Sequence, residues 1–108
     1  MGRFYYAPKQ EVTMIRLQIT NTGIRMDGHA SEYRSTDGNI VCAAISALTC
    51  TLIIALQSLA GNRIRAETGD GMTVIEWQEL SDTGKTLVNN WFLGIAEINR
   101  QYNCISYT

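Results

Sequence analysis

The sequence has few of the residues that build metal sites or disulfide frameworks. Its 108 residues include one His and three Cys, and no two of these Cys form a C-x-x-C pair. Three Cys cannot pair off completely, and this set lacks the spacing of a usual structural zinc site. We therefore predict no metal, and a reducing cytoplasm is the simplest setting.

The sequence also lacks an excess of charge of either sign and an apolar N-terminal segment. Nine basic and ten acidic residues give a formal net charge of −1, which produces no global field for nucleic acid. The first residues, MGRFYYAPKQEV, contain no apolar h-region of a secretory signal. We predict no nucleic-acid partner, an N-terminal extension over residues 1–11 and a single domain over residues 12–108.

Residues 40–60 contain no charged side chain, and a run of this length is long enough to cross a membrane. The polar residues that interrupt it are Ser46, Thr49, Thr51, Gln57 and Ser58. Many of the others are Ala or Cys, so we predict a central helix buried in a soluble domain, with no membrane contact. Cys50, about two turns beyond Cys42, is predicted to be a buried small hydrophobe.

The first third of the chain has the period-two pattern of half-buried strands. Apolar residues alternate with polar ones over residues 12–20, and a tight turn is expected at 21–23. The next strand is expected over residues 24–30, with Met26, Gly28 and Ala30 on one face. Asp27 and His29 then share the other face.

The second half of the chain predicts a hairpin, a helix and a final strand. Residues 62–67 and 72–78 flank the turn sequence Thr-Gly-Asp-Gly, and the charged first arm favours an edge position. Ser81 or Asp82 is expected to cap a helix with apolar residues at three- and four-residue spacing. Apolar and polar residues alternate weakly over residues 102–107, which predicts a final strand. The predicted fold is α+β, a mostly antiparallel sheet of about five strands packed against two helices, in the order β-β-α-β-β-α-β.

The candidate catalytic residues lie between residues 28 and 48, a segment that holds the only His and one of the three Cys. Cys42 is predicted in the first turn of the long helix, where unpaired N–H groups and the helix dipole favour thiolate over thiol. A nearby imidazole would complete the activation, and Asp27 is expected either to orient His29 or to be solvated. Residues 31–38 are predicted as a loop hinged at Gly38 that is either a lid or a plain connection. Gly28 and Ala30, on either side of His29, are also candidate substrate or lid residues, and Tyr33 either contacts peptide or anchors the loop.

The sequence Gly28-His29-Ala30, a short loop, and Ile-Val-Cys-Ala-Ala-Ile-Ser-Ala-Leu over residues 40–48 resemble the Prp family of ribosomal-processing cysteine proteases. In this resemblance His29 matches the catalytic His, Cys42 the nucleophile, and Ser46 a serine one turn beyond. Asn39 stands where the family usually has Asp; it can still cap a helix but supplies no carboxylate. The likeness covers roughly residues 12–107.

The resemblance implies a cysteine endopeptidase that removes a short N-terminal extension from a large-subunit ribosomal protein, cutting after an aromatic pair. It also implies a homodimer, no cofactor, and an oxyanion bound by backbone N–H groups near the helix start, with that of Cys42 as a candidate. Ser46 is expected either to bond a carbonyl one turn back or to help place His29 or substrate. Two alternatives stay open: a phage-encoded member that processes a capsid or scaffold protein, and a non-catalytic dimeric binding module.

Overall fold

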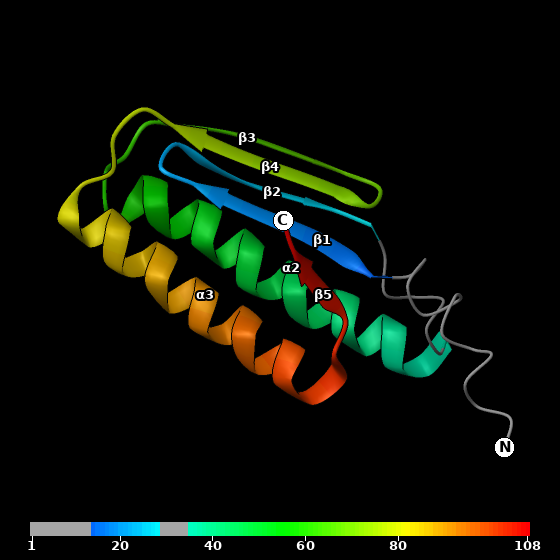
Figure 1. Cartoon of the computed structure of the whole chain (residues 1–108). Coiled ribbons are helices and arrows are strands. Elements are labelled where there is room, and N and C mark those ends of the chain that lie inside the picture. The colour runs from blue at the N-terminus through cyan, green and yellow to red at the C-terminus, as the bar shows by residue number, and fades with distance from the viewer. Residues whose placement is uncertain (1–13, 29–34) are drawn as a thin grey trace, which may run out of the picture.

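The computed structural model describes residues 14–28 and 35–108, with side chains from Ile40 onward in the second range. Its elements follow the predicted order (Figure 1). They are β1 (Ile15–Thr20), β2 (Gly23–Asp27), α2 (Ser35–Ser58), β3 (Ile64–Gly69), β4 (Met72–Trp77), α3 (Asp82–Tyr102) and β5 (Ile105–Tyr107). The predicted α+β class with two helices and five strands is confirmed for these residues.

The five strands form one sheet in the spatial order β3-β4-β2-β1-β5. The neighbours β3–β4, β4–β2 and β2–β1 are antiparallel, and β5 is parallel to β1, with Ile15 opposite Ile105. The sheet is therefore mostly antiparallel, as predicted. The charged first arm of the hairpin, β3, is an edge strand, which confirms the position that its composition indicated.

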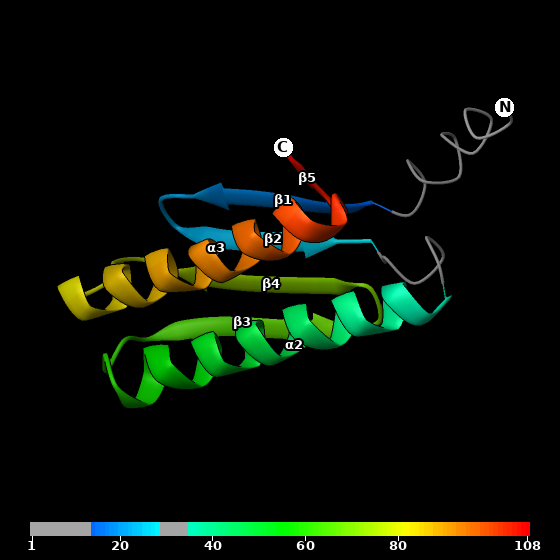
Figure 2. The same ribbon diagram turned by 90° about the horizontal axis from the view of Figure 1, so that it is seen from below.

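Both helices pack on the same face of the sheet (Figures 1 and 2). Seen from below, α2 runs along β3, and α3 runs along β1 and β2. The core fills the layer between helices and sheet, and its most buried large side chains are Leu17, Ile24, Leu56, Ile75 and Ile95. Burying one such side chain stabilises the fold by about 1.5–3 kcal/mol.

α3 has well-formed ends and a buried stripe. Ser81 is its N-cap and accepts a hydrogen bond from the N–H of Gly84 at 3.0 Å, and Asn103 ends it in the left-handed conformation. Trp91 is 2% exposed, and its indole N–H donates to the hydroxyl of Thr49 at 3.1 Å. This buried hydrogen bond ties α3 to α2 and satisfies both polar groups.

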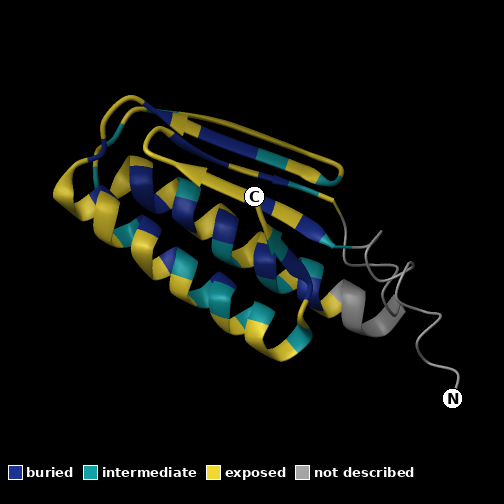
Figure 3. Cartoon of the chain, viewed as in Figure 1, coloured by how far each residue is buried: buried dark blue, intermediate teal, exposed yellow. Residues whose placement is uncertain are grey.

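α2 is less buried than the sequence predicted. In Figure 3 exposed positions recur along the length of the helix, and Ile54 is 62% exposed. A helix in a two-layer fold covers the sheet with one side only, so an apolar run does not require burial all round. Residues Ile40–Ser58, with a mean hydropathy of 2.2, meet the length and composition of a membrane span, a test that core helices of globular domains also pass.

Candidate active site

Cys42 lies further into α2 than predicted. The helix begins at Ser35, seven residues before Cys42, so the prediction that Cys42 occupies the first turn is wrong. The field of a helix terminus falls off within one turn, and the helix start therefore gives this thiol little help. Gly38 and Asn39 also lie inside the helix, which corrects their predicted roles as loop hinge and helix cap.

The backbone N–H of Cys42 is also not available to an oxyanion. At this depth in a helix the N–H donates to the carbonyl four residues earlier. The sequence-based expectation that Cys42 supplies an oxyanion-binding N–H is thus corrected. Other donors are needed for that role.

Cys42 is half-buried and lines a pocket of about 330 Å³. The pocket lies where α2 passes the β3–β4 turn and the facing side of β1 and β2. Its lining residues are Ile15, Met26, Cys42, Ile45, Ser46, Gly69, Asp70, Gly71, Met72 and Thr73. Sequence reasoning did not assign the turn residues to the site, because a hairpin turn gives no sign in the sequence of which helix it will face.

Ser46 lies in this pocket, one helical turn beyond Cys42. In the part of the chain that the structure describes, its hydroxyl makes no hydrogen bond, whereas the hydroxyl of Ser58 on the same helix donates to the carbonyl of Ile54 at 2.7 Å. The expected bond from Ser46 to a carbonyl one turn back is therefore not formed. The exposed hydroxyl is left for a ligand of the pocket.

Gly28 links the end of β2 to this pocket. Its N–H donates to the carbonyl of Gly71 at 2.9 Å, and its φ is 108°. A Cβ at this position would lie 2.6 Å from the carbonyl oxygen of Met14, so only glycine fits. Gly28, predicted as a substrate or lid residue, has a backbone role that holds the segment before His29 at the pocket.

The predicted strand over residues 24–30 ends early. β2 stops at Asp27, and the positive φ of Gly28 interrupts the alternation of faces. The predicted shared face of Asp27 and His29 required that alternation, which Gly28 interrupts. His29, Ala30 and Tyr33 lie outside the described residues, so their predicted roles stay predictions.

The carboxylate of Asp27 is engaged by arginines. It accepts a hydrogen bond from Nε of Arg16 at 2.7 Å and lies 3.7 Å from Nε of Arg25. All three side chains are on the strand face opposite to that of buried Met26. Asp27 is therefore part of a charge cluster on the uncovered face of the sheet, and its predicted role in orienting His29 stays a prediction.

The other two thiols differ sharply in exposure. Cys50 is exposed, which overturns its predicted burial. Cys104 is buried, as expected of a structural residue, and burial raises the pKa of its thiol. The physical reason for the first error is that Cys50 lies on the side of α2 that the sheet does not cover. Within residues 14–28 and 35–108, no three metal-ligating side chains come together.

The geometry offers a half-buried thiol beside an unbonded hydroxyl in an open pocket next to a hairpin turn, and a thiol at such a position can act as a nucleophile when a base is near. The chain matches the family model of the cysteine protease Prp over residues 11–105. No curated protein sequence matches it.

Several solved structures share the fold. A ribosomal processing protease Prp from S. aureus in complex with a substrate peptide matches with a TM-score of 0.74 and 21% identity, over 88% of this chain and 98% of that chain. The same protease with a covalently linked product peptide has a TM-score of 0.73. SMU.848 from Streptococcus mutans matches with a TM-score of 0.71 and 22% identity, over 89% of this chain and 93% of that chain.

Proposed function

Since the chain belongs to the cysteine protease Prp family, we propose that it cleaves a peptide bond with Cys42 as the nucleophile and His29 as the general base. Membership of a protease family makes the chain an enzyme and sets aside the non-catalytic binding module. The observation that carries the assignment is the position of Cys42 beside an unbonded Ser46 hydroxyl in an open pocket. We assign the protease domain to residues 12–108 and treat residues 1–11 as an extension.

In the proposed reaction His29 takes the proton of the Cys42 thiol, and the sulfur attacks the scissile carbonyl carbon. The C–N bond then breaks, and the imidazolium returns the proton to the leaving amine. Water attacks the remaining thioester carbonyl, which releases the acid and restores the thiol. The Ser46 hydroxyl is a candidate donor to the carbonyl oxygen as negative charge develops on it.

The proposed substrate is the short N-terminal extension of a large-subunit ribosomal protein, cut after an aromatic pair. Support comes from the family and from the S. aureus structural neighbour, which is a ribosomal processing protease solved with a substrate peptide. Such a substrate places the enzyme in the cytoplasm. A phage capsid or scaffold protein with a similar leader would be cut by the same chemistry, and comparing cleavage of the two leaders would separate these substrates.

We also propose a homodimer. α2 exposes apolar side chains along a side without a charged residue between Ile40 and Ser58. Ile40 is 51% exposed and Ile54 is 62% exposed. Covering such a surface with a second copy removes it from water, which is favourable by about 25 cal/mol per Å².

The test of the nucleophile is Cys42→Ala, assayed with a fluorogenic peptide that carries the ribosomal leader. We expect cleavage to fall to background while thermal unfolding stays cooperative, because one sulfur at a half-exposed position adds little packing. Cys50→Ser, an exposed thiol two turns further along the same helix, is the matched control and should keep full activity. Cleavage by Cys42→Ala would refute the assignment, and an active His29→Ala would show that another base is used.

A further inference from the structure

One edge of the sheet carries unpaired backbone groups in the part of the chain that the structure describes. β3 ends the strand order and pairs with β4 alone. The two strands are joined by the two-residue turn Asp70-Gly71, with Gly69 opposite Met72. In such a hairpin the residues flanking the turn bond each other, and bonding then recurs at every second pair.

The residues between these bonded pairs turn their N–H and C=O groups to the open edge. They are Ile64, Ala66 and Thr68. A second observation supports this alternation of bonded and open residues. Trp77 is opposite Ile64, and its N–H donates to the carbonyl of Thr22 at 3.0 Å on the β2 side. Trp77 therefore does not bond Ile64, and the edge beside Ile64 is open.

α2 lies beside this edge. It runs along β3 (Figure 2), and Cys42, Ser46, Ile53 and Gln57 recur at spacings that keep them on one side of the helix. Ile53 and Ile64 are partly buried against the core. The free edge of β3 therefore carries unpaired backbone groups, and α2 runs beside it.

The free edge of β3 starts at the active site. Gly69, the last residue of β3, lines the same pocket as Cys42 and Ser46. From there β3 runs back for 6 residues, about 17 Å between its first and last Cα atoms. A segment paired along β3 would therefore extend about five residues from a bond held at Cys42.

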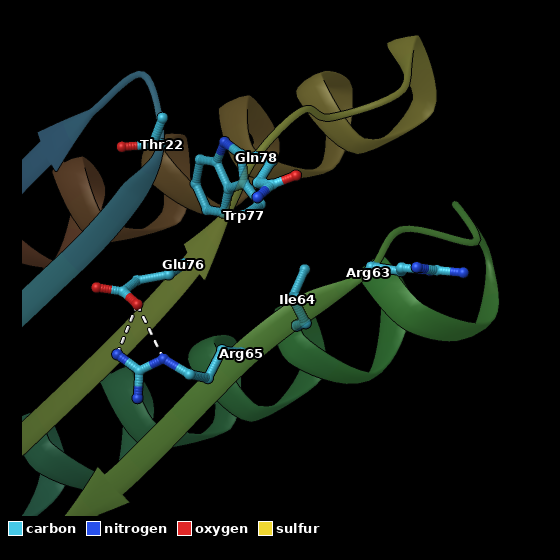
Figure 4. A pocket seen from close by; sticks show the side chains of 7 residues that line it. All are labelled: Thr22, Arg63, Ile64, Arg65, Glu76, Trp77 and Gln78. Carbon is cyan, nitrogen blue, oxygen red and sulfur yellow. Dashed lines mark hydrogen bonds and ion pairs between the residues drawn. The ribbon is translucent and has the colours of Figure 1, made fainter.

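A second hollow lies at the far end of β3, with a volume of about 600 Å³ (Figure 4). It is lined by Thr22, Arg63, Ile64, Arg65, Glu76, Trp77 and Gln78. In Figure 4 the Arg65 guanidinium is bonded to Glu76, while Arg63 points away from that pair. The indole N–H of Trp77 donates to the carbonyl of Asn21 at 2.8 Å, which fixes the ring as an apolar wall opposite Ile64.

We propose that β3 is the strand to which substrate adds. An extended polypeptide segment pairs with the outward groups of Ile64, Ala66 and Thr68, presents its scissile bond to Cys42, and places an apolar side chain about five residues away beside Trp77. The occupant is substrate rather than a second copy of β3, because Gly69, at the end of this edge, lines the Cys42 pocket. This inference rests on the proposed protease function and names the contacts that select its substrate.

The first test is Ala66→Pro, assayed with the fluorogenic leader peptide. Proline removes the outward N–H of residue 66 and leaves the β4 pairing intact, because an edge strand tolerates proline where the N–H faces outward. We expect KM to rise about tenfold, the effect of losing one well-placed hydrogen bond with a steric clash added, while kcat is kept. Glu67→Ala is the control. The Glu67 side chain is on the face of β3 opposite to that of Ala66, and its backbone groups face β4, so KM should stay unchanged.

The second test uses the native β3 and therefore does not depend on how Ala66→Pro folds. Leader peptides with a single N-methylated amide are bound to Cys42→Ala, and their affinity is read by fluorescence anisotropy. Methylation should weaken binding about tenfold at alternate positions only, because alternate amides of an added strand face β3. Loss of binding with no period of two would overturn the proposal, as would an unmodified leader that does not bind.

The outcomes separate this inference from the function on which it rests. A leader that binds with period-two sensitivity but is not cut by the wild-type chain would refute the proposed protease activity and keep the substrate strand. A leader that is cut, but with an unchanged KM in Ala66→Pro, would support the protease activity and refute the pairing of substrate with β3. If Ala66→Pro instead turns a dimer into a monomer at unchanged KM, the edge pairs with a second copy, and the proposal falls.

Discussion

At the scale of single residues, the three thiols are expected to differ in reactivity. Limited alkylation at roughly pH 6.5, read by peptide mass spectrometry, should label Cys42 first, because in the proposed mechanism His29 takes its proton. Cys50 should follow because it is exposed, and Cys104 should be slowest because burial raises the pKa of its thiol.

The pH dependence of Cys104 has a definite sign. A raised pKa keeps the thiol protonated at pH values where a free thiol, with a pKa of about 8.5, begins to ionise. Labelling of Cys104 in the folded chain should therefore rise only above that pH. His29→Ala should slow the labelling of Cys42 and leave Cys50 unchanged; if Cys42 reacts more slowly than Cys50 even with a small reagent, the thiol is not activated.

Ser46→Ala tests the oxyanion role. Removal of one donor to a developing oxyanion costs about 10²–10³ in kcat in other enzymes, and we expect a loss in kcat at the lower end of this range with KM little changed. Alkylation of Cys42 should stay as fast as before, because alkylation forms no oxyanion. Ser58→Ala, whose hydroxyl bonds a carbonyl of its own helix, is the control, and an unchanged kcat in Ser46→Ala would remove the serine from the mechanism.

At the scale of elements, the contact between β2 and the β3–β4 turn depends on Gly28. Gly28→Ala would strain the positive φ and push a methyl group against the carbonyl of Met14, and we expect a loss of about 1–3 kcal/mol in the free energy of unfolding. Gly61→Ala is the control, because Gly61 also has a positive φ but has open space around its Cβ position. The free energy of unfolding is measured by urea unfolding. If both variants lose the same amount, the clash with the Met14 carbonyl contributes nothing to the cost of Gly28→Ala.

Much of the fold could be predicted from the sequence because its elements carry strong periodicity. Ile15 and Leu17 alternate with exposed residues, and Val88, Trp91 and Ile95 recur at helical spacing, so the strands and α3 could be read directly. The start of α2 was missed because residues 35–39 are polar and glycine-containing, without an apolar pattern. A polar segment has no amphipathic spacing from which the start of a helix could be read.

The candidate site was predictable only in part. Cys42 and Ser46 followed from one helix and could be placed together by spacing alone. Their neighbours Gly69 and Met72 come from a hairpin whose position depends on how strands pair across the sheet, and strand order is not encoded locally. The exposure of Cys50 was missed for a related reason, since the uncovered side of a helix depends on where its neighbours pack.

At the scale of the whole molecule, the exposed side of α2 bears on assembly. Ile54→Glu would place a charge in the proposed dimer contact and should shift the chain toward monomer in sedimentation velocity, because burying an unpaired carboxylate is costly. Asn89→Glu adds the same charge on the exposed surface of α3 and should change nothing. A wild-type chain that sediments as a monomer at all concentrations would refute the homodimer.

The pairing of β1 with β5 also has a consequence for the order of folding. Ile15, which lines the Cys42 pocket, is opposite Ile105 and donates its N–H to the carbonyl of Cys104 at 2.9 Å. Contacts between residues so far apart in sequence carry a high loop-closure cost and form late. One wall of the pocket is thus completed only when β1 and β5 pair, so a partly folded chain would carry Cys42 without a finished pocket around it.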